Sequence, residues 1–487
     1  MTVQFAFDNS YARLPERFFA QLSPTPVAGP KMIRVNTALA EQLGIDPAFL
    51  ASEDGIAILS GNQVPEGAAS VALAYAGHQF GHFNPQLGDG RAILLGEVVG
   101  KDGLRRDIQL KGAGPTPFSR RGDGRAALGP VLREYIVSEA MAALGLPTTR
   151  ALAAVTTGED VVRETMLPGG VLTRVASSHI RVGTFQYFAA RGDNEAVKLL
   201  ADHAIARHYP AAASEANPYL AFLRMVAERQ ASLIARWLSI GFIHGVMNTD
   251  NCSVAGETID YGPCAFMDEY HPGTVFSSID QNARYAYGNQ PSIGLWNVSR
   301  LAETLLPLID PDQDKALEAA KEVLGVFGPR FHAEYAALLR RKIGLADAQE
   351  GDDELAQDLL KLMMASNADF TLTFRRLGEG DGASARDLFM DVTAFDAWHA
   401  RWLTRLAAEA ASPDVRRAAM RAINPAFIPR NHRVEAALNA AIERDDFGPF
   451  EELLAVLSRP YEDQPGMERY VEPPAESERV RQTFCGT

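Results

Sequence analysis

The sequence predicts an α+β fold, with a strand-rich N-terminal part and a mainly helical C-terminal part. Apolar and polar residues alternate between glycine turns from about residue 86 to residue 175, which is typical of strands. From about Asn194, apolar residues recur with the helical period of about 3.6 residues. A polar loop at residues 244–251 interrupts the helices, and its carboxylate and amide side chains are typical of a divalent-cation site.

The composition is that of a globular protein and narrows the function classes. The chain has 487 residues, of which 47% are hydrophobic and 22% charged, enough for two or three domain-sized units. Its net charge of −14 argues against a general nucleic-acid binder. No stretch approaches the roughly 18 apolar residues of a membrane span, and the N-terminus lacks a secretory pattern. Three cysteines are too few for a disulfide scaffold, so we expect a cytoplasmic protein.

Residues 1–70 are predicted to form an N-terminal extension. They begin as a proline-punctuated arm and then include a short helix, with Asn36 as its expected N-cap and Gly44 as its stop. The next segment is rich in glycine and histidine. Its His78 and His82 have the spacing of a helical metal pair, but no third ligand is near, so packed histidines are the favoured interpretation.

Two strands beyond this segment carry a pattern typical of phosphate binding. Gly88 and Gly90 bracket a tight turn, where glycines let backbone N–H groups approach a phosphate, and Arg91 adds a charged donor. Lys111 lies late in the following strand, within reach of a nucleotide's phosphates. A hairpin turn with no ligand is the alternative for the two glycines.

The loop at residues 112–125 is either a mobile surface loop or a second phosphate cradle, because it is too rich in glycine and charge to pack. Asp123 and Gly124 are its candidate ligand-facing pair. On the helix that follows, Glu134 is the candidate ion-pair partner of Lys111; the alternative is a solvated glutamate.

Two arginines follow in the strand-rich part. Arg174 lies at the end of a strand and Arg181 near the start of a helix, where a phosphate would gain from both guanidinium and helix N–H groups. Either could instead be an ordinary surface arginine.

The polar loop ends at Asn251, and Asp260 begins an Asp-Tyr-Gly motif nine positions later. These two residues could hold Mg²⁺ against phosphate oxygens, because hard cations take oxygen ligands. A protein kinase places its base five residues before such an asparagine. Here that position is Val246, which cannot accept a proton.

The order of these features is that of a protein kinase. We therefore predict a protein-kinase-like bilobal fold with a mixed-sheet N-lobe, a mainly helical C-lobe and family-specific extensions. The predicted boundaries are 71–190 for the N-lobe with its nucleotide-binding loops, 191–440 for the C-lobe with the metal loop, and 441–487 for a C-terminal tail ending in Cys485. Helices are expected at 225–238, 296–308, 315–327, 331–343, 354–364, 395–408, 434–443 and 450–457.

Longer strings are more specific. They are Gln86-Leu-Gly-Asp-Gly-Arg91, Gln109-Leu-Lys-Gly-Ala-Gly114, His244-Gly-Val-Met-Asn-Thr-Asp-Asn251 and Ile259-Asp-Tyr-Gly-Pro263, with Ser23-Pro-Thr-Pro-Val27 near the start. Together with Gln290-Pro291, Trp296-Asn297 and a cysteine three residues from the end, they resemble the selenoprotein O family of kinase-like protein adenylyltransferases. The resemblance covers essentially the whole chain.

The resemblance implies that the fold binds ATP inverted relative to kinases and transfers AMP to Ser, Thr or Tyr hydroxyls of proteins. It implies Mg²⁺, or Mn²⁺, held by Asn251 and Asp260, with Asp250 as proton acceptor and Glu134 paired with Lys111. The residues that it implies for ATP binding are Gly88, Gly90, Arg91, Lys111, Asp123, Gly124, Arg174, Arg181 and Asp260. A turn cap beside the metal loop is the alternative role for Asp250.

The resemblance also raises a redox hypothesis. Family members with cysteine or selenocysteine near the end can tether the C-terminus by a disulfide to the segment after Asp-Tyr-Gly. Cys485 matches that position, and Cys264 follows the motif, so a Cys264–Cys485 pair is a hypothesis. Cys252 is expected to be a small packed residue.

Two alternatives to AMP transfer stay open. Transfer of UMP or another nucleotide is one, because nothing in the sequence reads the base. A non-catalytic nucleotide-binding pseudokinase scaffold is the other, although intact Lys111, Asn251 and Asp260 argue against it. Protein substrates are the expected partners, with no nucleic acid and no membrane.

Overall fold

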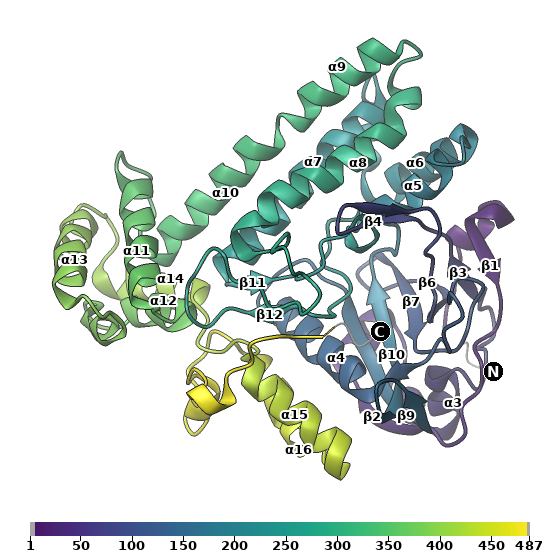
Figure 1. Ribbon diagram of the computed structural model, residues 1–487, viewed down its shortest axis with the longest axis horizontal. Coiled ribbons are helices and arrows are strands. Elements are labelled where there is room, and N and C mark those ends of the chain that lie inside the picture. Colours follow the sequence, from purple (N-terminus) through teal and green to yellow (C-terminus); the bar gives the residue numbers. More distant parts are fainter. Residues whose placement is uncertain (1–4, 485–487) are drawn as a thin grey trace.

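The computed structural model describes residues 5–484 and combines one large antiparallel sheet with many helices (Figure 1). The strand order is β1-β3-β6-β7-β10-β9-β2, and β8 pairs with β10. The strands are β1 (Phe19–Gln21), β2 (Lys31–Val35), β3 (Val71–Leu73), β6 (Ala92–Val99), β7 (Arg105–Lys111), β8 (Ala126–Ala127), β9 (Arg150–Val162) and β10 (Met166–Ala176). The chain is thus a mixed α and β protein, as predicted, but the large sheet is antiparallel where a mixed sheet was predicted.

The predicted N-terminal extension is part of this sheet. β1 pairs with β3 and β2 pairs with β9, so both add edge strands. The predicted helix is present as α1 (Thr37–Leu43): the Asn36 side chain accepts from the N–H of Leu39, and Gly44 ends the helix in the left-handed conformation. This prediction is confirmed. The two edge strands were not predicted, because they are short and the segment between them contains three prolines.

Helices cover both faces of the sheet, which explains why its central strands are apolar on both sides. Apolar residues of α1, α2 (Pro47–Leu50) and α3 (Glu53–Ser60) share a buried cluster with one face, including Ile93, Ile108 and Val171. On the other face, Ala151 and Leu172 pack with α4 (Leu128–Ala143). Behind α4 lie α15 (Asn431–Arg444) and α16 (Gly448–Leu457), in the same cluster.

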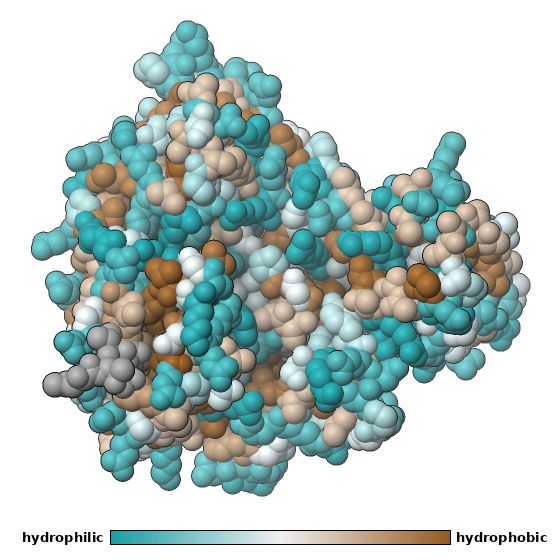
Figure 2. Space-filling view, turned by 180° about the vertical axis from the view of Figure 1, so that it is seen from behind, coloured by the Kyte–Doolittle hydropathy of each residue, from teal (hydrophilic) through white to brown (hydrophobic). Residues whose placement is uncertain are grey.

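The helical part builds a second large core, in which α7 (Pro218–Ser239) packs against α8 (Gln290–Ile309) and α10 (Phe327–Lys342). The other helices there are α5 (Val182–Ala189), α6 (Asn194–His208), α9 (Gln313–Leu324), α11 (Asp352–Ser366), α12 (Phe370–Leu377), α13 (Val392–Leu406) and α14 (Pro413–Ile423). Helices α11 to α14 lie far from the sheet, and in Figure 2 they form a projection on a mostly hydrophilic face. None of the helices in residues 5–484 has the length and apolar character that a membrane crossing requires.

The glycine- and histidine-rich segment forms a hairpin instead of a helix, with β4 (Gly77–Gln79) paired to β5 (His82–Asn84). His78 is packed, as favoured, since Gln186 Nε2 lies 2.9 Å from its Nδ1 and its ring contacts Phe83 and Trp296. His82 is exposed, so packing does not explain the second histidine. A second short pair, β11 (Phe242–Ile243) with β12 (Ala265–Phe266), encloses the polar loop. The loop that this second pair encloses contains Asp250, Asn251 and Asp260.

Candidate active site

The polar loop is held from both ends. It leaves β11 and returns through β12, so residues 244–264 form one long excursion from this two-stranded pair. His244 is fully buried, and its Nε2 lies 2.9 Å from the carbonyl oxygen of Ile259. Burial lowers the pKa of His244, so the neutral ring donates an N–H to that carbonyl and ties the Asn251 side of the loop to the Asp260 side.

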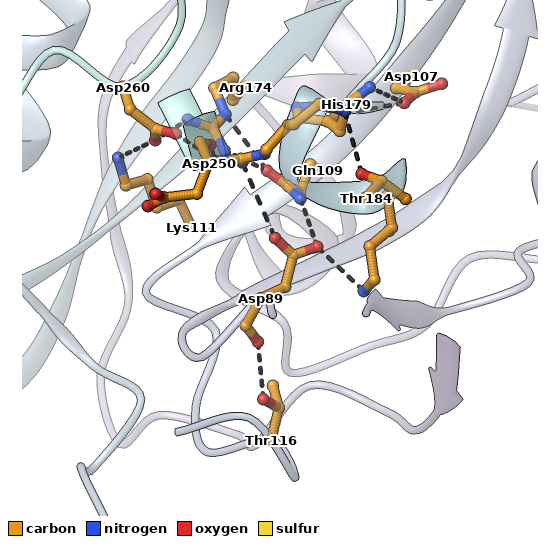
Figure 3. A network of polar contacts seen from close by, with 12 residues as sticks. Asp89, Asp107, Gln109, Lys111, Thr116, Arg174, His179, Thr184, Asp250 and Asp260 are labelled. Carbon is orange, nitrogen blue, oxygen red and sulfur yellow. Dashed lines mark hydrogen bonds and ion pairs between the residues drawn. The ribbon is translucent and has the colours of Figure 1, made fainter. Parts of the chain in front are cut away.

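Asp260 is the centre of the site, and three cations contact its carboxylate (Figure 3). Its Oδ1 accepts from Arg174 Nη1 at 2.6 Å and from Lys111 Nζ at 3.2 Å. Its Oδ2 accepts from Arg181 Nη1 at 2.6 Å. Burial alone would raise the pKa of Asp260, but Arg181, Arg174 and Lys111 outweigh it and hold that pKa well below its usual value. The carboxylate is therefore ionised.

Glu134 is a buried partner of the same cations and not a solvated surface residue. Its Oε2 lies 2.5 Å from Lys111 Nζ, and its Oε1 lies 3.2 Å from Arg174 Nη1. The side chain comes from α4, whose other face packs against α15 and α16. Packing of α4 therefore also fixes the position of Lys111.

Arg174 is oriented by two residues that the sequence did not single out as site residues. Gln109 Oε1 accepts from Arg174 Nη2 at 2.7 Å, and Gln109 Nε2 donates to Asp89 Oδ2 at 3.0 Å. Asp89 also accepts from the N–H of Leu73. All three side chains are buried, so this chain of contacts gives the guanidinium one defined orientation (Figure 3).

Arg181 is the N-cap residue of α5 and joins the two halves of the site. Its Nη1 donates to Asp260 and also to the backbone oxygen of Asp250, at 2.6 Å in each case. The guanidinium lies over the ring of Tyr75, 4.6 Å from its centroid. Tyr75, which lies between β3 and β4, was not predicted as a site residue, because an aromatic residue in an apolar segment gives no sequence signal for such a contact.

Asp250 is buried beneath the β4–β5 hairpin. Its Oδ2 accepts from Gln79 Nε2 at 3.1 Å, while its Oδ1 has no hydrogen-bond partner within residues 5–484. Burial raises the pKa of Asp250 to about 6. A carboxylate with one free oxygen and a pKa near neutrality is chemically suited to accept a proton.

Asn251 lies next to Asp250 at the end of a single 3₁₀ turn, Thr249–Asn251. Its Nδ2 donates to the backbone oxygen of Val246 at 3.0 Å, which leaves Oδ1 as the atom it can offer to a cation. Among residues 5–484, no group of three or more His, Cys, Asp or Glu side chains could hold a metal ion. The amide of Asn251 and the carboxylate of Asp260 fit a hard cation that takes its other oxygens from a nucleotide and water.

Packing requires the two glycines of the turn, Gly88 and Gly90, which the sequence alone did not indicate. A Cβ at Gly88 would lie 2.3 Å from the ring of Phe118, and one at Gly90 would lie 2.9 Å from the backbone oxygen of Phe118. Gly88 also has a φ of 76°. The turn and the loop at residues 112–125 are therefore packed directly on each other, and Arg91 directly precedes the strand β6.

Asp123 and Gly124 lie in that loop, and their contacts differ from those of the Asp260 group. Asp123 pairs with Arg163, at 2.8 Å from its Oδ2, and accepts from the N–H of Arg125. A Cβ at Gly124 would lie 2.1 Å from the backbone of Gly114. Within the described part of the chain, Asp123 has no contact with Lys111, Arg174 or Arg181, so the structure does not join it to the ion-pair cluster.

Two of the three cysteines lie in the described part of the chain, and both are buried. Cys252 is buried, and burial raises its pKa to about 12, as expected of a packed residue. Cys264 is buried after the Asp-Tyr-Gly motif, and Arg133 Nη2 donates to its backbone oxygen at 2.9 Å. Cys485, the other member of the hypothetical redox pair, lies outside the described residues.

Comparison with known proteins shows which family the chain belongs to. The family model described as protein adenylyltransferase SelO matches residues 1–458. The chain belongs to the SelO family. This confirms the family that the sequence motifs indicate.

Similar SelO-family relatives span the full length of the chain. The protein nucleotidyltransferase YdiU of Rhodopseudomonas palustris strain BisB5 is 65% identical over 492 residues, with 100% of both chains covered. The proteins of the same name from Bradyrhizobium sp. strain ORS 278 and from Methylorubrum populi are 65% and 64% identical, again with 100% of each chain covered.

Proposed function

We propose that this protein is an adenylyltransferase that moves AMP from ATP to Ser, Thr or Tyr hydroxyls of other proteins, with ATP inverted relative to kinases. The observation that carries the proposal is the buried Asp260 carboxylate with Lys111, Arg174 and Arg181 around it, next to Asp250. Membership of the SelO family supplies the reaction class, and adenylyl transfer implies ATP as the co-substrate.

The residues proposed to contact ATP are Gly88, Gly90, Arg91, Lys111, Asp123, Gly124, Arg174, Arg181 and Asp260. Three of them now pair with Asp260 itself. Binding would exchange these ion pairs, so that the cations turn to the phosphates and Asp260 turns to a metal. The kinase-like bilobal arrangement, with lobes at 71–190 and 191–440, is part of the same proposal.

Asn251 and Asp260 would hold Mg²⁺, or Mn²⁺ in its place. Such an ion supplies charge stabilisation at the α-phosphate and at the pyrophosphate leaving group. Asp250 would accept the proton of the attacking hydroxyl through its unpartnered Oδ1. Because Val246 stands at the kinase base position, transfer of the terminal phosphate would lack its proton acceptor.

We also propose that the protein works in the cytoplasm on protein partners. The low cysteine content and the net charge of −14 support this, since they favour a reducing compartment and disfavour nucleic acid.

A second candidate reaction is transfer of UMP. The names of the relatives are compatible with UMP transfer, because they specify a nucleotidyltransferase without naming the nucleotide.

The test is to incubate the protein with α-labelled ATP or α-labelled UTP, a protein mixture and Mg²⁺ or Mn²⁺. We expect label in protein from ATP, and none with the Asp260→Ala variant. Label from UTP alone would replace the first candidate by the second. Activity that persists in Asp260→Ala would remove Asp260 from its metal role.

A further inference from the structure

A polar cavity of about 530 Å³ lies beside the catalytic loop and has no role in the nucleotide site. Its wall is formed by Phe80 of the β4–β5 hairpin, by the loop from Ile279 to Arg284 and by Ser292 and Ile293 at the start of α8. The cavity is large enough for a few side chains of a bound peptide.

The cavity wall is directly connected to the catalytic carboxylate. The N–H of Phe80 donates to Asn248 Oδ1 and to Tyr285 Oη, at 3.1 Å in each case, and Tyr285 Oη donates to Asn248 at 2.6 Å. The neighbouring Gln79 donates to Asp250 Oδ2. Phe80 in the cavity wall is thus the sequence neighbour of Gln79, which contacts Asp250.

Asp250 lacks a donor on the other side. Its Oδ1 is buried and has no partner among the described residues, which is costly for a carboxylate oxygen. A hydroxyl group from a bound segment would supply the missing donor. Gln79 and Asn248 link the cavity wall to the Asp250 loop, and the Asp250 Oδ1 lies against Gly77 of the same hairpin.

Arg284 and Asp280 are the charged residues that line this cavity. Arg284 stacks on Trp296 and Tyr285, with its guanidinium carbon 4.8 Å and 5.7 Å from the two ring centroids. Its Nε has no hydrogen-bond partner within residues 5–484. The carboxylate of Asp280 accepts from the backbone N–H groups of Arg284 and Tyr285, not from the Arg284 guanidinium.

Arg300 provides a contrast on the same ring. Its guanidinium carbon lies 5.1 Å from the centroid of Trp296, but it also pairs with Glu303 at 2.6 Å. Of these two arginines, Arg284 faces the cavity and has its charge available for a ligand. The cavity also exposes an apolar side chain, since Ile279 is 52% exposed.

We propose that this cavity binds the segment of the protein substrate that carries the acceptor hydroxyl, and that Arg284 selects segments with an Asp or Glu beside that hydroxyl. The inference rests on the proposed transfer to protein hydroxyls. The net charge of −14 disfavours acidic substrates at long range, so an acidic preference must come from a local cation such as Arg284.

The test uses peptide libraries with a fixed Tyr, Ser or Thr and random flanking positions, modified by the wild-type protein with α-labelled ATP. We expect Asp or Glu at one flanking position to raise kcat/KM about tenfold over Gln or Asn, as one charge-assisted hydrogen bond would. Arg284→Gln should abolish this preference, and Arg284→Glu should turn it into a preference for Lys or Arg at the same position.

Arg300→Gln is the matched control, because it removes an arginine from the same Trp296 ring and should leave the acidic preference intact. ATP affinity should be equal in all variants. Two results would overturn the inference but leave the proposed function standing. One is labelled peptides without acidic enrichment, and the other is the same acidic enrichment in Arg284→Glu as in the wild type. The absence of α-label from every peptide and every protein with the wild type would overturn the proposed function and the inference together.

Discussion

Asp260 is the carboxylate that three cationic side chains of the site share. Lys111, Arg174 and Arg181 contact it, and Glu134 neutralises part of the same positive charge. Because the cations are already paired, a bare phosphate would have to break these ion pairs to bind. A metal that takes over the Asp260 carboxylate would remove that cost.

Removal of the metal should therefore weaken ATP binding in the wild type much more than in Asp260→Asn. The variant frees three cations for the phosphates, so we expect it to bind metal-free ATP at least tenfold more tightly than the wild type. Titration calorimetry with and without EDTA measures this. Equal affinities of the two proteins for metal-free ATP would show that the ion pairs do not compete with the nucleotide.

Gln109 should act as a positioning residue for Arg174. Gln109→Met keeps the volume but removes the contacts to Arg174 and Asp89, leaving two buried charged groups under-satisfied. We expect a loss of about 1–3 kcal/mol in the free energy of unfolding, as for buried polar groups that lose a partner. We also expect KM for ATP to rise more than kcat falls. Urea denaturation and steady-state kinetics measure the two effects, and an unchanged KM would limit Gln109 to a structural role.

The β4–β5 hairpin is the element that packs against the Asp250 carboxylate. A Cβ at Gly77 would lie 2.4 Å from Asp250 Oδ1, so Gly77→Ala must displace either the hairpin or the carboxylate. We expect kcat to fall at least tenfold with little change in ATP affinity. Gly328→Ala is the control, since nothing lies within 4 Å of its Cβ and its φ is not positive. An active Gly77→Ala protein would mean that Asp250 does not need its present position.

The elements that could be predicted from the sequence are those with capping or turn residues at their ends. Helix α1 has a capping asparagine and a terminal glycine, and both act as expected. The β4–β5 hairpin was missed because its strands have three residues each, too few to show a period. Tertiary contacts to Asn248 and Thr249 stabilise it. The burial of Gln109 also could not be predicted, because the alternation of side chains along a strand does not show which face of the sheet contacts a charged residue.

Lys342 allows a test at the scale of the whole molecule, because it connects α10 to the projecting group of helices. It is 2% exposed, and its Nζ lies 4.3 Å from the ring centroid of Phe374 in α12. Burial lowers its pKa from 10.5 to about 7. Between these values the unfolded chain binds a proton that the folded protein does not bind, so this residue makes stability rise with pH.

Lys342→Met should remove that dependence. Below about pH 7 the variant should be more stable than the wild type by up to a few kcal/mol, and the difference should shrink as pH rises toward 10. Urea denaturation across this pH range, with wild type and variant compared at each pH, isolates the contribution of Lys342. A difference that does not change with pH would contradict the lowered pKa.

The arrangement of the whole molecule explains why the site combines residues from distant segments. The sheet supplies Lys111 and Arg174, α4 supplies Glu134, α5 supplies Arg181, and the loop between β11 and β12 supplies Asp250 and Asp260. The order of these residues along the chain was visible in the sequence and predicted a nucleotide site. Their mutual distances depend on how the sheet packs against the helices, which no local pattern encodes.

The most direct test of the account is to follow both ends of ATP in one reaction. The protein is incubated with a protein mixture, Mg²⁺ and ATP that carries different labels at its α- and γ-phosphates, and the label that stays with protein is counted. The account predicts that the α-label is retained and the γ-label is released in pyrophosphate. Retention of the γ-label without the α-label would contradict it and identify a phosphoryl transferase.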